Sequence, residues 1–161
     1  GKSLADAVQE YIWDPLGAEE DAYIGVDPHS FGRAAGGLCV TLRDLARFGE
    51  MMRNNGVAAG KQVVPRWWIN DIQKNGNAAA WQRGGYLSLF PNGNYRNKWY
   101  TVELGRPAFC GIGIHGQYLY IDPEAEMVIV RQSSQAVSFD VPFDQMFLRA
   151  CRAIGDGLSG R

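Results

Sequence analysis

The hydrophobic pattern changes its period near residue 84, and this change restricts the fold more than any other feature of the chain. Before it, apolar residues recur at helical spacing in segments 4–12 and 42–52. After it, four segments alternate with a period of two, as antiparallel strands do: GYLSLF, YRNKWYTVEL, GQYLYI and EMVIVRQ. Helical spacing returns over 143–158. The pattern predicts an α+β chain in which a closing helix covers one face of an antiparallel sheet.

Capping residues and turn formers set the expected boundaries of these elements. Ser3 with Asp6, and Thr41 with Asp44, have the spacing of a capping box at the start of a helix. The first helix is expected to stop within 14–17, the second at 54–56, and a short third helix to begin at Pro65. We expect loops over 18–37 and 76–80, hairpin turns at 91–94 and 122–125, and a cap for the last helix at Ser138 or Asp140.

Composition excludes several kinds of partner and site. A chain of 161 residues is long enough for one domain with a core, and its net charge of -1 comes without a basic run, so nucleic acid and anionic lipid are not expected partners. No apolar run approaches the roughly 18 residues that a membrane span needs. The three cysteines are widely spaced, which supports neither a disulfide framework nor a zinc site. Nothing in the sequence implies a metal or an organic cofactor.

No residue of the chain is an evident catalytic nucleophile. None of the serines lies in a G-x-S-x-G pattern, and none is followed three residues later by lysine. His115 could act as an acid or a base, but no acidic residue or cysteine stands at a spacing that implies a partner, which favours a structural or pocket-lining role. The Tyr95-Arg96-Asn97 triplet matches a short Tyr-x-Asn pattern, yet cross-strand contacts account for it better.

The glycines beside His115 carry more information than the histidine does. Gly111, Gly113 and Gly116 fall inside a predicted strand, where glycine weakens the strand and marks either a bulge or a close approach to the backbone. Free N–H groups at an open strand edge suit a developing oxyanion. A twist or corner in a curved sheet explains the glycines equally well, so both interpretations stay open.

Three blocks in a fixed order resemble the carboxy-terminal part of a known family. They are SLADAVQEYIWDPLG, GGLCVTLRDLARFGEMM and GQYLYIDPEAEMVIV, and together they span nearly the whole chain. Their order is similar to that of the penicillin-recognising serine hydrolases, which include class C β-lactamases, related esterases and, most closely, the 6-aminohexanoate-dimer (nylon oligomer) hydrolases. The resemblance implies a partial β-lactamase/transpeptidase-like fold, with residues 1–80 from its helical region and 81–161 from its antiparallel sheet and closing helix.

The same resemblance implies that the catalytic side chains lie upstream. In this family an acyl-enzyme forms on the serine of a Ser-x-x-Lys motif, and the lysine and the tyrosine of a later Tyr-x-Asn or Tyr-x-Ser motif handle protons. Both motifs precede the block that begins at Gly1, so the chain resembles a fragment that is inactive alone. Tyr95 comes too late in the order to be the family tyrosine.

The third family motif is the part of the site that the chain retains by this resemblance. Counting back from the aromatic-x-Asp-Pro end of the next strand places it on Gly111-Ile112-Gly113, where relatives have Lys-Thr-Gly or His-x-Gly. Ile114 then matches the position whose backbone N–H forms half of the oxyanion hole. Glycine at the first position departs from the β-lactamase pattern and favours an amidase or esterase pocket.

Further roles follow from the resemblance alone. Gly111, Ile112, Gly113 and His115 would border the substrate, and Asp140 resembles a substrate-contacting position near the charged end of an amide substrate. The expected function is therefore hydrolysis of a small amide or ester by the parent protein, in the bacterial cytoplasm or periplasm. The alternative is a non-catalytic binding or scaffold module. Open sheet edges left by missing strands could pair between chains.

Overall fold

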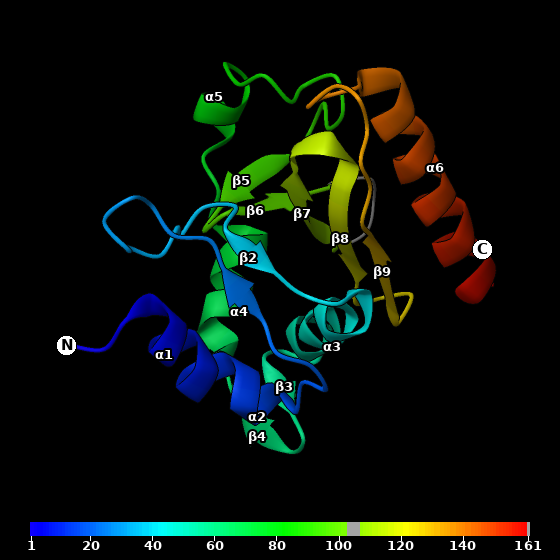
Figure 1. The fold of residues 1–161 in the computed structure, drawn as a ribbon. Coiled ribbons are helices and arrows are strands. Elements are labelled where there is room, and N and C mark those ends of the chain that lie inside the picture. The colour runs from blue at the N-terminus through cyan, green and yellow to red at the C-terminus, as the bar shows by residue number, and fades with distance from the viewer. Residues whose placement is uncertain (103–106, 161) are drawn as a thin grey trace.

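The computed structural model describes residues 1–102 and 107–160, which form a mixed α+β fold, as the sequence predicts (Figure 1). The helices are α1 (Leu4–Val8), the π-helical η1 (Gln9–Trp13), α2 (Asp14–Leu16), α3 (Leu42–Arg53), α4 (Arg66–Lys74), α5 (Ala78–Trp81), the 3₁₀ turn η2 (Ile114–Gly116) and α6 (Val141–Leu158). The strands are β1 (Tyr23–Ile24), β2 (Leu38–Cys39), β3 (Val57–Ala58), β4 (Lys61–Gln62), β5 (Asn94–Arg96), β6 (Trp99–Thr101), β7 (Phe109–Gly113), β8 (Gln117–Asp122) and β9 (Met127–Arg131).

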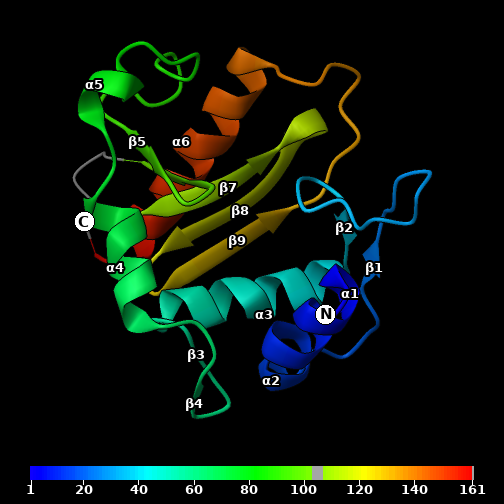
Figure 2. The same ribbon diagram turned by 90° about the vertical axis from the view of Figure 1, so that its left-hand side faces the viewer.

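The main sheet is an antiparallel meander in the order β5-β6-β7-β8-β9. Helix α6 lies against one face and α3 against the other (Figure 2). Side chains alternate between these faces, so Cys110, Tyr118 and Tyr120 pack with residues of α6, whereas Phe109 and Leu119 pack with residues of α3. The odd-numbered positions of β7, which include both of its glycines, therefore face α3.

The predicted helix caps are confirmed. Ser3 Oγ accepts a hydrogen bond from the Asp6 N–H at 3.1 Å, and Asp6 returns one by accepting from the Ser3 N–H. The helical run continues through η1 and α2 until Gly17, which is left-handed (φ 70°) and ends it. Asp140 caps α6 by accepting from the Phe143 N–H at 3.2 Å. Among the described residues, no helix is long and apolar enough to cross a membrane.

Helix α3 approaches the sheet closely because one of its sheet-facing residues is a glycine. A Cβ atom on Gly49 would lie 2.6 Å from Val128 and 2.7 Å from Leu119. The start of the helix is fixed by Thr41, whose Oγ1 accepts from the Asp44 N–H at 3.1 Å. This close packing holds α3 against β8 and β9.

Three predicted features of the middle segment are wrong. GYLSLF is not a strand: its residues form hydrogen-bonded turns in which the Leu89 and Phe90 N–H groups donate to the Tyr86 carbonyl. The described part of YRNKWYTVEL is not one strand either, because the chain reverses within it and pairs Arg96 with Trp99. Residues 103 and 104 of this segment lie outside the described residues. The hairpin turn is thus Asn97-Lys98, six residues beyond the expected start at 91. A short helix, α5, also begins inside the expected 76–80 loop, with Asn77 as its cap.

Candidate functional site

The carboxyl end of β7 has an edge that β6 does not cover. Strand β6 pairs only with Phe109 and Cys110, whereas β8 pairs with β7 as far as Gly113. From Gly111 onward, the side of β7 that faces away from β8 therefore lies beyond the end of β6. In this stretch the glycines indicate either a twist of the sheet or a close approach to the backbone, and the family resemblance implies contact with a substrate.

The ladder fixes which backbone groups face this open edge. The Val102 N–H donates to the Ala108 carbonyl at 2.9 Å, so even-numbered residues of β7 direct their backbone groups toward β6. Ile112 continues this alternation. Gly113 is extended (φ -111°, ψ 165°) and pairs with Gln117, so the peptide that follows it turns the Ile114 N–H away from β8. The N–H groups of Ile112 and Ile114 thus point along the same open edge.

A hollow of about 410 Å³ adjoins this edge on the α3 side of the sheet. Its walls are mostly apolar and come from the loop before α3, from α3, from the β5–β6 turn, and from strands β6, β7 and β8. The residues that line it are Gly36, Leu45, Phe48, Lys98, Trp99, Gly111, Ile112, Gly113, Gln117, Tyr118 and Leu119. The structure therefore brings together Gly111, Ile112 and Gly113, the triplet to which the sequence assigned substrate contact.

Glycine occupies positions 111 and 113 of β7 for different physical reasons. A Cβ on Gly111 would meet only Trp99, at an ordinary 3.9 Å, so this glycine widens the hollow rather than avoiding a clash. A Cβ on Gly113 would lie 2.9 Å from the Cβ of Gln117, which is too close. Gly113 is therefore required by the tight end of the β7–β8 hairpin, while Gly111 leaves space for something else.

Aromatic rings form the wall opposite the glycines. Phe48 of α3 stacks on Trp99 with ring centroids 6.4 Å apart and planes 14° apart. Trp99 in turn packs edge-on against Phe109 at 5.2 Å. The sequence favours core packing over ligand stacking for Trp99, and Phe48 lies in the apolar stripe of a predicted helix, because such residues are typical of any core. Only the packing of α3 against the end of β6 reveals that they share a hollow.

His115 serves as an anchor for the segment that precedes α6. Its N–H donates to the Ser138 carbonyl at 3.0 Å, and its Nδ1 lies 2.8 Å from the Gln135 carbonyl, which requires the proton on Nδ1. The residue is left-handed (φ 58°) and half-buried, and it does not line the hollow. These contacts fix the turn that carries Ile114, whose side chain is 67% exposed.

Asp140 also lies outside the lining of the hollow. Its carboxylate caps α6, two residues after the Ser138 carbonyl that holds His115. The structure thus places Asp140 near the turn at Ile114, with one oxygen used in the cap. Figure 1 shows this segment entering α6 at the same end of the sheet as the β7–β8 turn.

The hollow contains no evident nucleophile or metal ligand set. None of its described lining residues is serine, cysteine, histidine or acidic. Within residues 1–102 and 107–160, no group of three or more histidine, cysteine or acidic residues could hold a metal ion. Burial raises the pKa of the Cys110 and Cys151 thiols, that of Cys151 to about 12, so neither is a thiolate near neutral pH.

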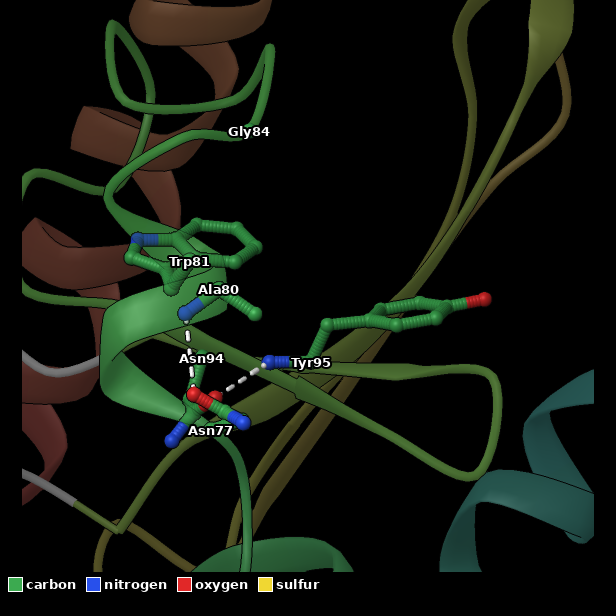
Figure 3. Close-up of a pocket in the computed structure, with 6 residues that line it drawn as sticks. All are labelled: Asn77, Ala80, Trp81, Gly84, Asn94 and Tyr95. Carbon is green, nitrogen blue, oxygen red and sulfur yellow. Dashed lines mark hydrogen bonds between the residues drawn. The ribbon is translucent and has the colours of Figure 1, made fainter.

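A second pocket, of about 260 Å³, lies between α5 and β5 and is separate from the predicted site (Figure 3). It is lined by Asn77, Ala80, Trp81, Gly84, Asn94 and Tyr95. Two of its amide oxygens are engaged locally, since Asn77 accepts from the Ala80 N–H and Asn94 from the Tyr95 N–H, each at 2.9 Å. Because no residue of the open β7 edge borders it, we place the candidate site at the larger hollow.

Comparison with known proteins gives consistent matches. The sequence model of the beta-lactamase family matches residues 1–150. A 6-aminohexanoate-dimer hydrolase of Paenarthrobacter ureafaciens is 42% identical over 134 residues, which cover 83% of this chain and 34% of that protein.

Solved structures agree with the sequence match. A Bacillus anthracis protein assigned as a 6-aminohexanoate-dimer hydrolase superposes with a TM-score of 0.84 and 37% identity, over 99% of this chain and 40% of its own. A Bacteroides dorei protein assigned as a beta-lactamase gives a TM-score of 0.61 at 20% identity, over 93% of this chain and 52% of its own, and supports the fold alone. The chain thus spans between about a third and a half of the length of these relatives, and the expected β-lactamase-like fold is confirmed.

Proposed function

We propose that this chain, which belongs to the beta-lactamase family, forms part of a serine hydrolase that cleaves small amides or esters through an acyl-enzyme. Residues 1–80 would come from its helical region and 81–161 from its sheet region. The Ser-x-x-Lys nucleophile and the proton-handling tyrosine would lie upstream of residue 1, and the chain alone would be inactive. The relatives named as hydrolases of an amide dimer motivate this choice of substrate class.

The observation that carries the proposal is the backbone at Ile114. Its N–H points along an edge of β7 that β6 leaves uncovered, next to a hollow that Gly111 keeps wide. In acyl transfer, a fixed N–H donor stabilises the negative charge that develops on the carbonyl oxygen in the transition state. Ile114 would supply one such donor, and the N–H of the upstream serine would supply the other.

The remaining site residues take supporting roles in this proposal. Gly111, Ile112 and Gly113 would border the acyl group, and His115 would hold the turn through its bonds to Gln135 and Ser138. Asp140 would lie near the charged end of an amide substrate. An amidase or esterase pocket suits the hollow better than a β-lactam pocket, because glycine occupies the position of the cationic or imidazole side chain of the third motif.

The alternative is a binding or scaffold module without chemistry, which would lack the upstream Ser-x-x-Lys motif and would form no covalent intermediate. Strands β5 and β9 are the two edges of the main sheet. In a fragment without further strands, these edges would favour pairing between chains, which sedimentation or light scattering would detect as self-association. Self-association therefore follows from either function, whereas a covalent intermediate is expected of the hydrolase parent alone.

The test is therefore the acyl-enzyme itself. The complete encoded protein is mixed with p-nitrophenyl butyrate, quenched, and digested for mass spectrometry. We expect turnover and a butyryl group on a serine upstream of residue 1, and we expect the isolated 161-residue chain to show only background hydrolysis. Turnover by the isolated chain that disappears on substitution of one of its own serines, or turnover without any acylated serine, contradicts the proposal.

A further inference from the structure

The candidate hollow carries a single formal charge among its described lining residues. Lys98 is the only lysine, arginine, aspartate or glutamate in that set, and the other lining groups are apolar, glycine, or neutral polar. Its side chain is exposed at the rim of the hollow. A positive charge beside an otherwise uncharged cavity attracts an anionic group on whatever occupies the cavity.

The backbone at this lysine is unusual for its residue type. Asn97 and Lys98 are the two central residues of the β5–β6 hairpin turn, and both have positive φ, 52° and 71°. Turns of this kind favour Asn-Gly, because glycine has no Cβ to oppose positive φ. Lysine at the second position is therefore unfavourable for the turn. Backbone strain of this kind persists only where the surrounding structure enforces it, and it is common at binding sites.

A carboxylate on α4 holds the turn in this conformation. Asp71 accepts from Arg96 Nε at 2.7 Å, from Arg96 Nη2 at 3.2 Å and from Asn97 Nδ2 at 2.7 Å. Arg96 contributes most, followed by the amides of Asn75 and Asn97, to lowering the pKa of Asp71 to about 2. Asp71 therefore remains charged at neutral pH, and its contacts fix Asn97, the residue directly before Lys98.

The hollow relates Lys98 to the proposed oxyanion donor. The last β6–β7 pair is Tyr100 with Cys110, and beyond it Lys98 and Ile112 line the same hollow, with Ile112 two residues before Ile114. Two residues of strand span about 7 Å. A substrate with its scissile carbonyl at Ile114 and a carboxylate at Lys98 would therefore carry a short methylene chain between these two groups.

We infer that Lys98 is a specificity-determining residue, which binds a carboxylate on the amide or ester substrate while the scissile carbonyl lies at Ile114. The inference rests on the proposed hydrolase function and narrows its substrates to those with a free carboxylate. Asp71 is the positioning residue that keeps Lys98 at the rim. Trp99 and Phe48 would contact the apolar chain between the two polar ends of the substrate.

The test compares matched substrates on the complete encoded protein. One pair is the p-nitrophenyl monoester of adipic acid and its methyl ester, which differ only in a free carboxylate on the acyl side. The other is N-acetyl-6-aminohexanoate and its methyl ester, which differ in the same way on the leaving-group side. For each variant the ratio of kcat/KM within a pair is measured, so that a general loss of activity cancels.

Three variants separate charge from turn geometry. Lys98→Met removes the charge and keeps the strained side chain, Lys98→Gly removes the charge and relieves the turn, and Lys98→Arg keeps the charge. We expect Met and Gly to lower the preference for the free carboxylate in one pair by about two- to fivefold, as for an exposed ion pair, with the change mainly in KM. Lys98→Arg should retain the preference, and Lys98→Gly should fold at least as stably as the parent.

Ionic strength gives an independent readout. The preference of the parent protein should decline as salt is raised from about 0.01 M to 1 M, because the screening length falls from about 30 Å to 3 Å. If both neutral methyl esters are cleaved and neither ratio changes in Lys98→Met and Lys98→Gly, the inference is wrong and the proposed function stands. If no ester or amide is cleaved, the proposed function fails and the inference fails with it.

Discussion

Replacing Asp44 with asparagine should strongly destabilise the chain, because this buried carboxylate has four separate donors. Its Oδ1 accepts from the Glu19 N–H at 2.9 Å and from Arg47 Nη1 at 3.0 Å. Its Oδ2 accepts from the Glu20 N–H at 3.2 Å and from Thr41 Oγ1 at 2.8 Å. The side chain thereby ties the segment after α2 to the start of α3, the helix that contributes Phe48 to the hollow.

The magnitude follows from what an amide cannot do at this position. Asparagine keeps one acceptor oxygen and presents an NH₂ group to the donors that faced the other oxygen. In either orientation of the amide, its NH₂ group faces the backbone N–H of Glu19 or of Glu20, which then has no acceptor. The negative charge that pairs with Arg47 is also lost. An unsatisfied buried group costs about 1–3 kcal/mol, and we expect a total loss of about 2–4 kcal/mol in the free energy of unfolding.

Urea denaturation of the 161-residue chain measures this loss. The matched control is Asp21→Asn, which removes an exposed carboxylate from the same connecting segment and should change the free energy of unfolding by less than about 0.5 kcal/mol. If Asp44→Asn unfolds within that same margin of the parent, the four contacts do not hold the segment in place and the reasoning is refuted.

The difference between parent and Asp44→Asn should also depend on pH. Burial acts to raise the pKa of Asp44, but the donors from Glu19, Thr41, Glu20 and Arg47 outweigh it and hold the pKa below the ordinary 3.8. A carboxyl group with a lowered folded-state pKa stabilises the fold above its unfolded pKa and loses that contribution as pH falls through its folded pKa. The two proteins should therefore differ in full at pH 7 and converge only as pH falls below 3.8, through the lowered pKa of Asp44 in the folded state.

Two further predictions concern packing and thiol accessibility. Gly49→Ala should lower the free energy of unfolding by about 1–2 kcal/mol, because the added methyl group would overlap Val128 and Leu119. The control, Gly157→Ala, should raise it by about 0.5 kcal/mol, because a Cβ atom there meets no atom within 4 Å. Urea curves with the same sign for both variants would contradict this assignment. In native buffer, Ellman's reagent should react quickly with the exposed Cys39 and slowly with the buried Cys110 and Cys151, so two or more fast thiols would be inconsistent with the structure.

Local sequence patterns were sufficient to predict the helix and turn boundaries that depend on nearby residues. Ser3, Thr41 and Asp140 each accept a hydrogen bond from an N–H three residues ahead, so sequence spacing alone locates these caps. The β8–β9 turn was predictable for the same reason, since Asp122 accepts from the Glu124 and Ala125 N–H groups within the turn.

The middle segment could not be predicted because distant partners determine it. The alternating apolar residues of GYLSLF bury against the core as a series of turns, with the Phe90 carbonyl accepting from Trp81 Nε1 and the Ser88 carbonyl from Gln145 Nε2. The turn at Asn97-Lys98 depends on Asp71, which lies 26 residues before Asn97. The period of the hydrophobic pattern cannot distinguish a buried turn from a buried strand where contacts with residues distant in the sequence determine the local structure.

The candidate site was assigned from the family resemblance, and its walls could not be predicted. Counting back from the aromatic-x-Asp-Pro end that the family shares assigned roles to Gly111 and Ile114, and the structure places both at the carboxyl end of β7. Phe48 and Lys98 reach the same hollow from α3 and from the β5–β6 turn, and nothing local to either residue predicts that they meet.

Substitution of Ile114 by proline tests the central claim most directly, because it removes the N–H and little else. Ile114 is the first residue of a 3₁₀ turn, the extended Gly113 before it has the conformation that precedes proline, and its side chain is largely exposed. Ile114→Ala, which keeps the N–H, is the control. In the complete encoded protein, we expect proline to lower kcat for p-nitrophenyl butyrate by about 10²–10³-fold and alanine to leave it near the parent value. A folded proline variant that retains kcat within a few fold of the alanine variant would contradict the account.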